Sequence, residues 1–267
     1  MDPHALNAVV ELARAHGLPH RDAVVLKDGS NLLVHLRPAP VVVRVATFTA
    51  FIRHDPLPYL QREVALGEHL AAAGAAVVPP ADELPAGPHQ VGEWWLTAWR
   101  HVPHDANAVP AALDVLHSLD ELRVALAGFA GDLPAYGPVA ADLDLALACC
   151  VEHRLLPAGE ADELRARRDE LLAVVASLPR QAQHGDAHPR NVLVTAGGIV
   201  WNDLEDCCAA SPLWDLATLA RRDTSGAVLA VAEERYGVDA TRAMVGLRDV
   251  QGRVWTVLHD ARSTLVG

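Results

Sequence analysis

The sequence predicts an α+β protein, with a small antiparallel sheet in its first part and a mainly helical second part. Within the first hundred residues, the spacing of apolar side chains changes from the helical period to the alternating period of strands. The strands predicted there are joined by short turns, which suits antiparallel pairing. Beyond about residue 101 the helical period returns, and a single hairpin pattern interrupts it. These three observations favour a chain with two lobes.

The first lobe is expected to begin with an amphipathic helix that runs from Asp2 to about His16 and is stopped by Gly17. Its strands are predicted at residues 23–29, 32–37, 41–45 and 91–98, and a helix is predicted at 58–73. The second lobe is expected to contain helices near residues 109–119, 138–155, 159–177, 212–222, 225–236 and 239–263. Strands at 192–195 and 199–201, joined by a Gly-Gly turn, form the predicted hairpin.

Charge and composition exclude several classes of protein. The 267-residue chain has a net charge of −12, which argues against nucleic-acid binding because that needs clustered Lys and Arg. The longest segment without Asp, Glu, Lys or Arg, residues 69–81, is too short to span a bilayer, so no membrane association is expected. The first residues do not resemble a secretory signal. The four cysteines form two adjacent pairs, which suits reduced thiols and a cytoplasmic location.

The segment most informative about chemistry runs from His184 to Asn191 and reads His-Gly-Asp-Ala-His-Pro-Arg-Asn. Asn191 directly precedes one strand of the predicted hairpin, and Asp203 follows the partner strand. Since a hairpin brings its two ends together, these two side chains are expected to lie close to each other. A carboxylate and an amide oxygen are hard ligands that suit Mg²⁺ bound together with phosphates. Asp186 is expected at the mouth of this site, where it can orient a hydroxyl group and accept its proton.

This arrangement is similar to the catalytic loop and metal-binding aspartate of protein kinases. With Gly after the first His, the segment resembles the aminoglycoside phosphotransferase and choline kinase-like family, whose pattern is H-G-D-x-x-x-x-N followed by an Asp at a strand end. The Trp-Asp-Leu-Ala segment that begins at Trp214 is similar to a later helix start of that family. The resemblance covers most of the chain. It implies a bilobal protein kinase-like fold, with a nucleotide-binding lobe at 1–98, a hinge at 99–103 and a helical lobe at 104–267.

In the helical lobe, the resemblance implies that Asp186 is catalytic and that Asn191 and Asp203 bind the metal. It also implies that His184 and Asp215 orient the loop, with Asp215 accepting hydrogen bonds from backbone N–H groups of residues 184–186. Arg190 stands where Gly is common in the family. Two interpretations of Arg190 remain open: it neutralises the transferred phosphate, or it is a solvated charge.

In the nucleotide-binding lobe, the resemblance implies a cation on the third strand that holds the α- and β-phosphates and is held by a helix Glu. Arg44 is the candidate cation, and Glu63 is the better matching glutamate on the following helix. Apolar neighbours on both sides of Arg44 favour a buried pair over a surface charge. Ser30 and Asn31 lie in the turn between the first two strands, where family members cover the phosphates.

At the hinge, the resemblance implies that backbone groups from Thr97 to Arg100 bind the adenine edge. For Trp99 two interpretations are possible: its indole stacks on the base, or it packs in the core.

Together these residues imply a phosphotransferase that uses ATP or GTP with Mg²⁺ and acts on a hydroxyl group of a small molecule. Residues 101–267 carry a net charge of −10, so the first expected acceptor is cationic, an aminoglycoside or another antibiotic that the reaction would inactivate. Choline, a sugar, homoserine or a natural-product intermediate is an alternative acceptor, and a nucleotide-binding regulator is a further alternative. A monomer or a homodimer is expected. The acidic residues proposed to contact the acceptor are Glu205, Asp206, Asp142, Glu233 and Asp260.

Overall fold

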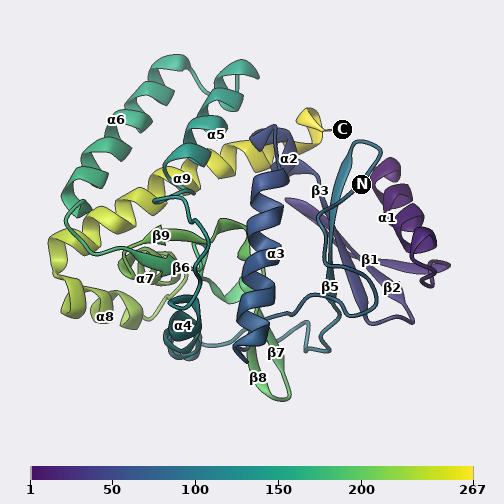
Figure 1. Cartoon of the computed structure of the whole chain (residues 1–267). Coiled ribbons are helices and arrows are strands. Elements are labelled where there is room, and N and C mark those ends of the chain that lie inside the picture. Colours follow the sequence, from purple (N-terminus) through teal and green to yellow (C-terminus); the bar gives the residue numbers. More distant parts are fainter. Residues whose placement is uncertain (1, 267) are drawn as a thin grey trace. The chain divides into compact units, whose positions relative to one another are not determined.

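The alternating apolar residues of the first hundred positions form a five-stranded antiparallel sheet in the computed structural model, which describes residues 2–266 (Figure 1). The strand order is β1-β2-β3-β5-β4. The strands are β1 (Asp22–Asp28), β2 (Asn31–Arg37), β3 (Val41–Ala46), β4 (His89–Val91) and β5 (Trp94–Arg100). Val43 of the central strand β3 is paired with Val34 of β2 and with Ala98 of β5, and all three side chains are fully buried.

Three helices accompany this sheet. Helix α1 (Pro3–Ala15) starts at Asp2, whose side chain accepts a hydrogen bond from the N–H of His4 (2.7 Å), and its apolar face packs against the sheet. Helix α3 (Leu57–Ala72) contacts β5. The short helix α2 (Phe48–Arg53), directly after β3, is missing from the sequence-based prediction because six residues are too few to establish a helical period.

The strand predicted at 91–98 is in fact part of a hairpin. Strand β4 ends at Val91, Gly92 turns the chain with a φ of 60°, and β5 begins at Trp94, which is paired directly with Val91. Glycine adopts this conformation readily, so Gly92 is where the sequence marks the turn. The turn has only two residues, Gly92 and Glu93, which are too few to separate the two strands in the sequence pattern.

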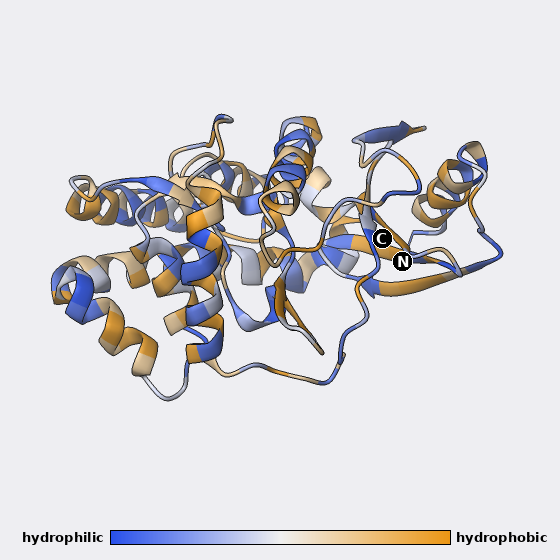
Figure 2. Ribbon diagram, turned by 60° about the horizontal axis from the view of Figure 1, so that its bottom comes forward, coloured by the Kyte–Doolittle hydropathy of each residue, from blue (hydrophilic) through white to orange (hydrophobic). Residues whose placement is uncertain are grey.

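The second part of the chain is mainly helical, as predicted. Its longest helix, α9 (Val238–Leu265), contacts α5, α6, α7 and α8 (Figure 1). Most of its helices carry both hydrophobic and hydrophilic residues along their length (Figure 2), as expected for helices that bury one face. The other helices are α4 (Ala112–Leu126), α5 (Ala141–Glu152), α6 (Ala158–Val175), α7 (Leu213–Ala220) and α8 (Ala227–Tyr236).

Two small two-stranded sheets interrupt these helices. Strands β7 (Val192–Thr195) and β8 (Gly198–Trp201) form the predicted hairpin. Strand β6 (Gln181–Gln183) pairs with β9 (Cys208–Ala210), and this second sheet is absent from the prediction. Strands of three residues show no alternation that a sequence could reveal. Strand β6 leads directly into His184, so this sheet holds the start of the H-G-D segment.

The described residues group into two compact units, and each is treated by itself below. Unit 1 comprises residues 2–105, 195–205 and 266, and unit 2 comprises Ala106–Val194 and Asp206–Leu265. Residues 195–205 belong to unit 1 because the backbone of Trp201 bonds to Ala76 O (2.8 Å) and to Val78 N (2.7 Å). This differs from the predicted lobes, which assign the whole hairpin to residues 104–267. Across the described residues, we find no helix that combines the length and the apolar character needed to cross a membrane.

Candidate functional site

The loop after β6 in unit 2 is fixed by a carboxylate from α7. The backbone N–H groups of His184 and Gly185 donate to the two oxygens of Asp215, each over 2.9 Å. Both His184 and Asp215 are fully buried. The hydrogen bonds expected between Asp215 and this loop are therefore present. His184 contributes as well, because its Nδ1 accepts a hydrogen bond from the N–H of Asp186 (3.3 Å).

Gly185 cannot be replaced without moving the backbone. Its φ is +88°, and a Cβ added here would lie 1.8 Å from the carbonyl oxygen of Asp206. The main chain of Asp206 thus lies against this loop within unit 2. The contact expected between the Asp206 side chain and the acceptor stays a prediction. The close approach explains on physical grounds why the segment reads H-G-D.

The carboxylate of Asp186 receives hydrogen bonds at both oxygens. Arg248 Nη2 lies 2.7 Å from Oδ1, while Asn191 Nδ2 and His188 Nε2 each lie 3.1 Å from Oδ2. The Asp186 side chain is still 28% exposed, which leaves it accessible from solvent. It is therefore an oriented carboxylate at the surface of unit 2.

The tautomer of His188 follows from its neighbours. Its Nδ1 accepts a hydrogen bond from the backbone N–H of Arg190 (3.1 Å), so the proton of the neutral ring is on Nε2. That Nε2–H can donate to Asp186. Arg190 thus orients the ring of His188 through its backbone N–H group, and this role does not depend on the Arg190 side chain.

The pKa of Asp186 is held well below its ordinary value. Burial alone would raise the pKa, but the hydrogen bond from His188 and the positive charge of Arg248 outweigh burial. The Asp186 carboxylate is therefore ionised near neutral pH, and it can accept a hydrogen bond from a hydroxyl group.

Arg248 is the site residue that sequence reasoning missed. It lies on α9, 62 residues after Asp186, and is only 7% exposed. No motif surrounds it. A signal was nevertheless present, because Arg248 occupies the apolar stripe of α9 next to the buried Leu247 and three residues before Gln251. A charged residue on a buried face needs a partner of opposite charge.

Asn191 is oriented by the same carboxylate. Its Nδ2 donates to Asp186 Oδ2 (3.1 Å) and to the Asp186 carbonyl oxygen (3.0 Å). Because the amide nitrogen makes both of these bonds, the amide oxygen is the atom that can bind a metal ion. This donor fits Mg²⁺, which prefers oxygen ligands.

Unit 1 contains a buried cluster of charged residues around Arg44. Arg44, on β3, is 5% exposed, so the interpretation as a surface charge is excluded. One of its terminal nitrogens, Nη1, donates to Glu63 of α3, as expected, and Nη2 forms an ion pair with Glu205. The same nitrogen lies 3.8 Å from Asp203 Oδ1. Arg44 thus connects the sheet, helix α3 and the segment that follows β8.

Glu205 has other partners than the acceptor proposed for it. Besides Arg44, it forms an ion pair with Arg53 of α2 (2.9 Å) and accepts a hydrogen bond from Asn31 Nδ2 (3.3 Å). Asn31 in turn accepts from Thr49 Oγ1 (2.6 Å). The carbonyl oxygen of Ser30 accepts from the N–H of Thr49 (3.1 Å). The turn expected to cover the phosphates is therefore attached to α2, and nucleotide binding by Ser30 and Asn31 stays a prediction.

Burial raises the pKa of Glu63 to about 8. The positive charge of Arg44 opposes this shift, while the negative charges of Glu205 and Asp203 add to it. With a proton on Glu63, the two arginines Arg44 and Arg53 balance the two carboxylates of Glu205 and Asp203. The cluster then has no net charge, which suits its burial.

Asp203, the aspartate expected to bind the metal, lies beside this cluster. It follows β8 by two residues and has a φ of 62°, a conformation that Asp tolerates better than most residues. Its side chain is 35% exposed, whereas Arg44 beside it is buried. An accessible carboxylate fits the hard ligand set of Mg²⁺.

The side chains proposed to bind adenine have partners of their own. Trp99 is 8% exposed, packs with Val64, and donates from Nε1 to the fully buried Thr97 (2.8 Å). These contacts match the second interpretation of Trp99, in which its indole packs in the core. The side chain of Arg100 pairs with Asp82, and its backbone N–H donates to Pro79 O (2.9 Å). The segment at 79–86 thus occupies polar groups of β5, and an adenine contact at 97–100 stays a prediction.

The other acidic residues proposed for the acceptor do not share one position in unit 2. Asp142 is buried in the first turn of α5, and Glu233 is exposed on α8. Asp260 lies on α9, twelve residues beyond Arg248, which corresponds to about 18 Å along a helix. Their contact with an acceptor stays a prediction.

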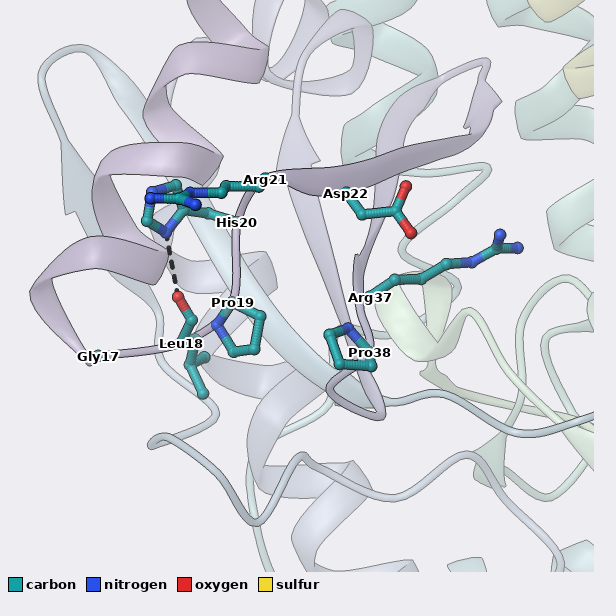
Figure 3. A pocket seen from close by; sticks show the side chains of 8 residues that line it. All are labelled: Gly17, Leu18, Pro19, His20, Arg21, Asp22, Arg37 and Pro38. Atoms are coloured by element: carbon teal, nitrogen blue, oxygen red, sulfur yellow. Dashed lines mark hydrogen bonds between the residues drawn. The ribbon is translucent and has the colours of Figure 1, made fainter.

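An open pocket of about 430 Å³ lies at the end of α1 in unit 1 (Figure 3). His20 Nδ1 bonds to the carbonyl oxygen of Leu18 at its edge (3.1 Å). None of the proposed site residues lines this pocket, so it is separate from the groups described above. Its lining consists of Gly17, Leu18, Pro19, His20, Arg21, Asp22, Arg37 and Pro38.

Solved structures similar to this chain have the protein kinase-like fold. One is an amicoumacin kinase in complex with AMP-PNP, Ca²⁺ and Ami (15% identity, TM-score 0.67, 98% of this chain and 89% of that chain). Another is APH(2″)-IIIa in complex with GDP and kanamycin (16%, 0.64, 97% and 93%). A third is the choline kinase LicA from Streptococcus pneumoniae (15%, 0.60, 96% and 91%). No curated protein sequence matches the chain.

The family of the chain follows from its sequence. Residues 23–247 match the model of the phosphotransferase enzyme family. This match spans most of the chain and includes the H-G-D loop, the hairpin and Arg44. The chain therefore belongs to the phosphotransferase enzyme family.

Proposed function

We propose that this phosphotransferase moves the γ-phosphate of ATP or GTP to a hydroxyl group of a small molecule, with Mg²⁺ as its metal. The single observation that carries the proposal is the accessible carboxylate of Asp186, which three donors hold in place. Such a group can orient a hydroxyl oxygen for in-line attack on phosphorus.

In the proposed step, the acceptor oxygen forms a bond to the γ-phosphorus while the bond from that phosphorus to the β,γ-bridging oxygen breaks. The hydroxyl proton passes to Asp186 and then to solvent, and the nucleoside diphosphate leaves. Because the pKa of Asp186 is low, its main contribution is to orient the hydroxyl group, and the proton moves late in the step.

We assign the nucleotide phosphates to Arg44 and the metal to Asp203 and Asn191. When bound, Mg²⁺ neutralises phosphate oxygens and screens the charge of the leaving group. The contact with Glu63 orients Arg44, and Asp186 orients the amide of Asn191. The hairpin of β7 and β8 begins one residue after Asn191 and ends two residues before Asp203, which supports their joint assignment.

For the acceptor we propose a cationic antibiotic such as an aminoglycoside. The net charge of −10 in residues 101–267 favours a positively charged partner, and two similar structures are complexes with Ami and with kanamycin. A small metabolite is the second candidate, favoured by the similarity to a choline kinase.

The experiment is a screen for nucleotide consumption with Mg²⁺ and either ATP or GTP. Aminoglycosides, other cationic antibiotics, choline, homoserine and sugars serve as acceptors, and mass spectrometry detects the phosphorylated product. An added mass of one phosphate on one class of acceptor supports the proposal. Consumption of nucleotide without any phosphorylated acceptor would contradict it.

A further inference from the structure

We propose that Arg248 is a positioning residue of the transfer reaction, because it holds the Asp186 oxygen to which the acceptor hydroxyl binds. The inference rests on the proposed function, since it assumes that Asp186 receives that hydroxyl group. It adds a residue from α9 that lies outside the H-G-D loop.

The position of Arg248 is fixed on several sides. Its Nη2 bonds to Asp186 Oδ1 (2.7 Å), and its Nη1 bonds to Gln251 and lies 3.4 Å from the carbonyl oxygen of Gly185. The guanidinium carbon lies 4.9 Å from the centre of the Trp214 ring. Trp214 is itself fixed, because its Nε1 donates to the same Gly185 oxygen (2.7 Å). A guanidinium held in this way offers one fixed donor to Asp186.

The arrangement of donors selects one oxygen of Asp186 for the acceptor. An ionised carboxylate accepts about four hydrogen bonds, two at each oxygen. Oδ2 already receives Asn191 and His188, while Oδ1 receives Arg248 alone. The remaining position is on Oδ1. An acceptor hydroxyl therefore binds beside Arg248, at the atom that Arg248 fixes.

Loss of this contact should affect orientation more than nucleotide binding. Without Arg248, the carboxylate retains its two donors at Oδ2 and can rotate about the bond that carries it. A reacting group that is displaced by about 1 Å can cost about 100-fold in rate. The groups assigned to the phosphates are in unit 1, so the nucleotide KM should stay unchanged.

The test compares Arg248→Met, Arg248→Lys and Arg253→Met with the wild-type enzyme. Methionine keeps most of the buried volume of arginine without its charge, and lysine keeps the charge. Arg253 is the matched control on the same helix, because it is exposed and pairs with Glu160 (3.2 Å) away from Asp186. Transfer to the acceptor found by the screen gives kcat and both KM values. Urea unfolding of Arg248→Met, Asp186→Ala and the double variant gives the coupling between the two residues.

We expect Arg248→Met to lower kcat about 100-fold with an unchanged nucleotide KM, and Arg248→Lys to recover part of the rate. The destabilisation of the double variant should be smaller than the sum of the two single effects. A wild-type kcat in Arg248→Met overturns the inference, as does additive destabilisation. A loss of kcat that only follows the unfolded fraction overturns it too. If the wild-type enzyme phosphorylates no acceptor, the proposed function fails, and the inference fails with it.

Discussion

At the scale of single residues, Arg44 is the group whose burial the sequence indicates most directly. Arg44 interrupts a run of valines, and a continuous apolar run is typical of a strand that is buried on both faces. A buried arginine needs carboxylates, and Glu63 is the partner that the helical period of 58–73 offers. The second partner, Glu205, could not be predicted in this role because it is 161 residues away. Its negative charge alone instead favours the assignment of Glu205 to the binding of a cationic acceptor.

Replacement of Arg44 by alanine should weaken ATP binding much more than adenosine binding, because only the phosphates lose a partner. It should also lower the free energy of unfolding by about 3–5 kcal/mol, since the ionised Glu205 stays buried with one cation fewer. Calorimetric titration and urea unfolding measure the two effects. For stability, Arg100→Ala is the control, because its ion pair with Asp82 is exposed and should be worth less than about 1 kcal/mol. Equal losses for ATP and adenosine would remove Arg44 from the phosphates.

The raised pKa of Glu63 predicts how stability depends on pH. The folded protein keeps a proton on Glu63 up to about pH 8, whereas the unfolded chain releases it near its ordinary value of 4.5. This contribution to the free energy of unfolding is complete below the ordinary value and is lost as the pH rises through about 8. Glu63→Gln removes the titrating group and keeps a hydrogen-bond acceptor. The variant should therefore lose less stability than the wild-type protein between about pH 5 and 8. Parallel curves in urea unfolding would show that Glu63 does not titrate in this window.

At the scale of elements, the sequence predicts the longer helices and strands and the β7–β8 hairpin, but it misses other short elements. Helix α3 and strands β2 and β3 are long enough to show their periods. Helix α2 and strands β6 and β9 have three to six residues, so their formation depends on contacts that the sequence does not display. The H-G-D loop is the exception, since it has no period but is identified by its residue types. Arg248 is outside that motif and reaches Asp186 only through the packing of α9.

The H-G-D loop itself can be tested through Gly185. Alanine at this position would require a left-handed conformation and would place its Cβ against the backbone of Asp206. The two effects together should lower the free energy of unfolding by about 3 kcal/mol and abolish transfer.

Gly159→Ala is the matched control, because Gly159 is in the first turn of α6 and has open space around it. It should leave stability unchanged or raise it by up to about 1 kcal/mol. If Gly185→Ala were as stable and as active as this control, the close approach of Asp206 to the loop would be refuted.

At the scale of the whole molecule, net charge favours some classes of partner over others without locating a binding site. The net charge of −12 argues against nucleic acid, and the same charge favours a cationic acceptor. The acidic residues that produce it are spread over several helices of unit 2, however, and Asp142, Glu233 and Asp260 occupy separate elements. Net charge therefore supports a class of acceptor but does not locate its binding residues, which depend on how helices and loops pack.

The most direct test of the account is phosphoryl transfer by the wild-type chain and by Asp186→Ala, with nucleotide binding measured on both. Transfer of the terminal phosphate is followed with γ-labelled ATP and GTP, Mg²⁺ and the acceptor panel, and a parallel reaction contains a chelator of Mg²⁺. The account predicts transfer by the wild-type chain only when Mg²⁺ is present. It predicts no transfer by Asp186→Ala and a nucleotide affinity within about twofold of the wild-type value, since Asp186 faces the acceptor. Transfer by Asp186→Ala at the wild-type rate, or loss of nucleotide binding together with transfer, would contradict the account.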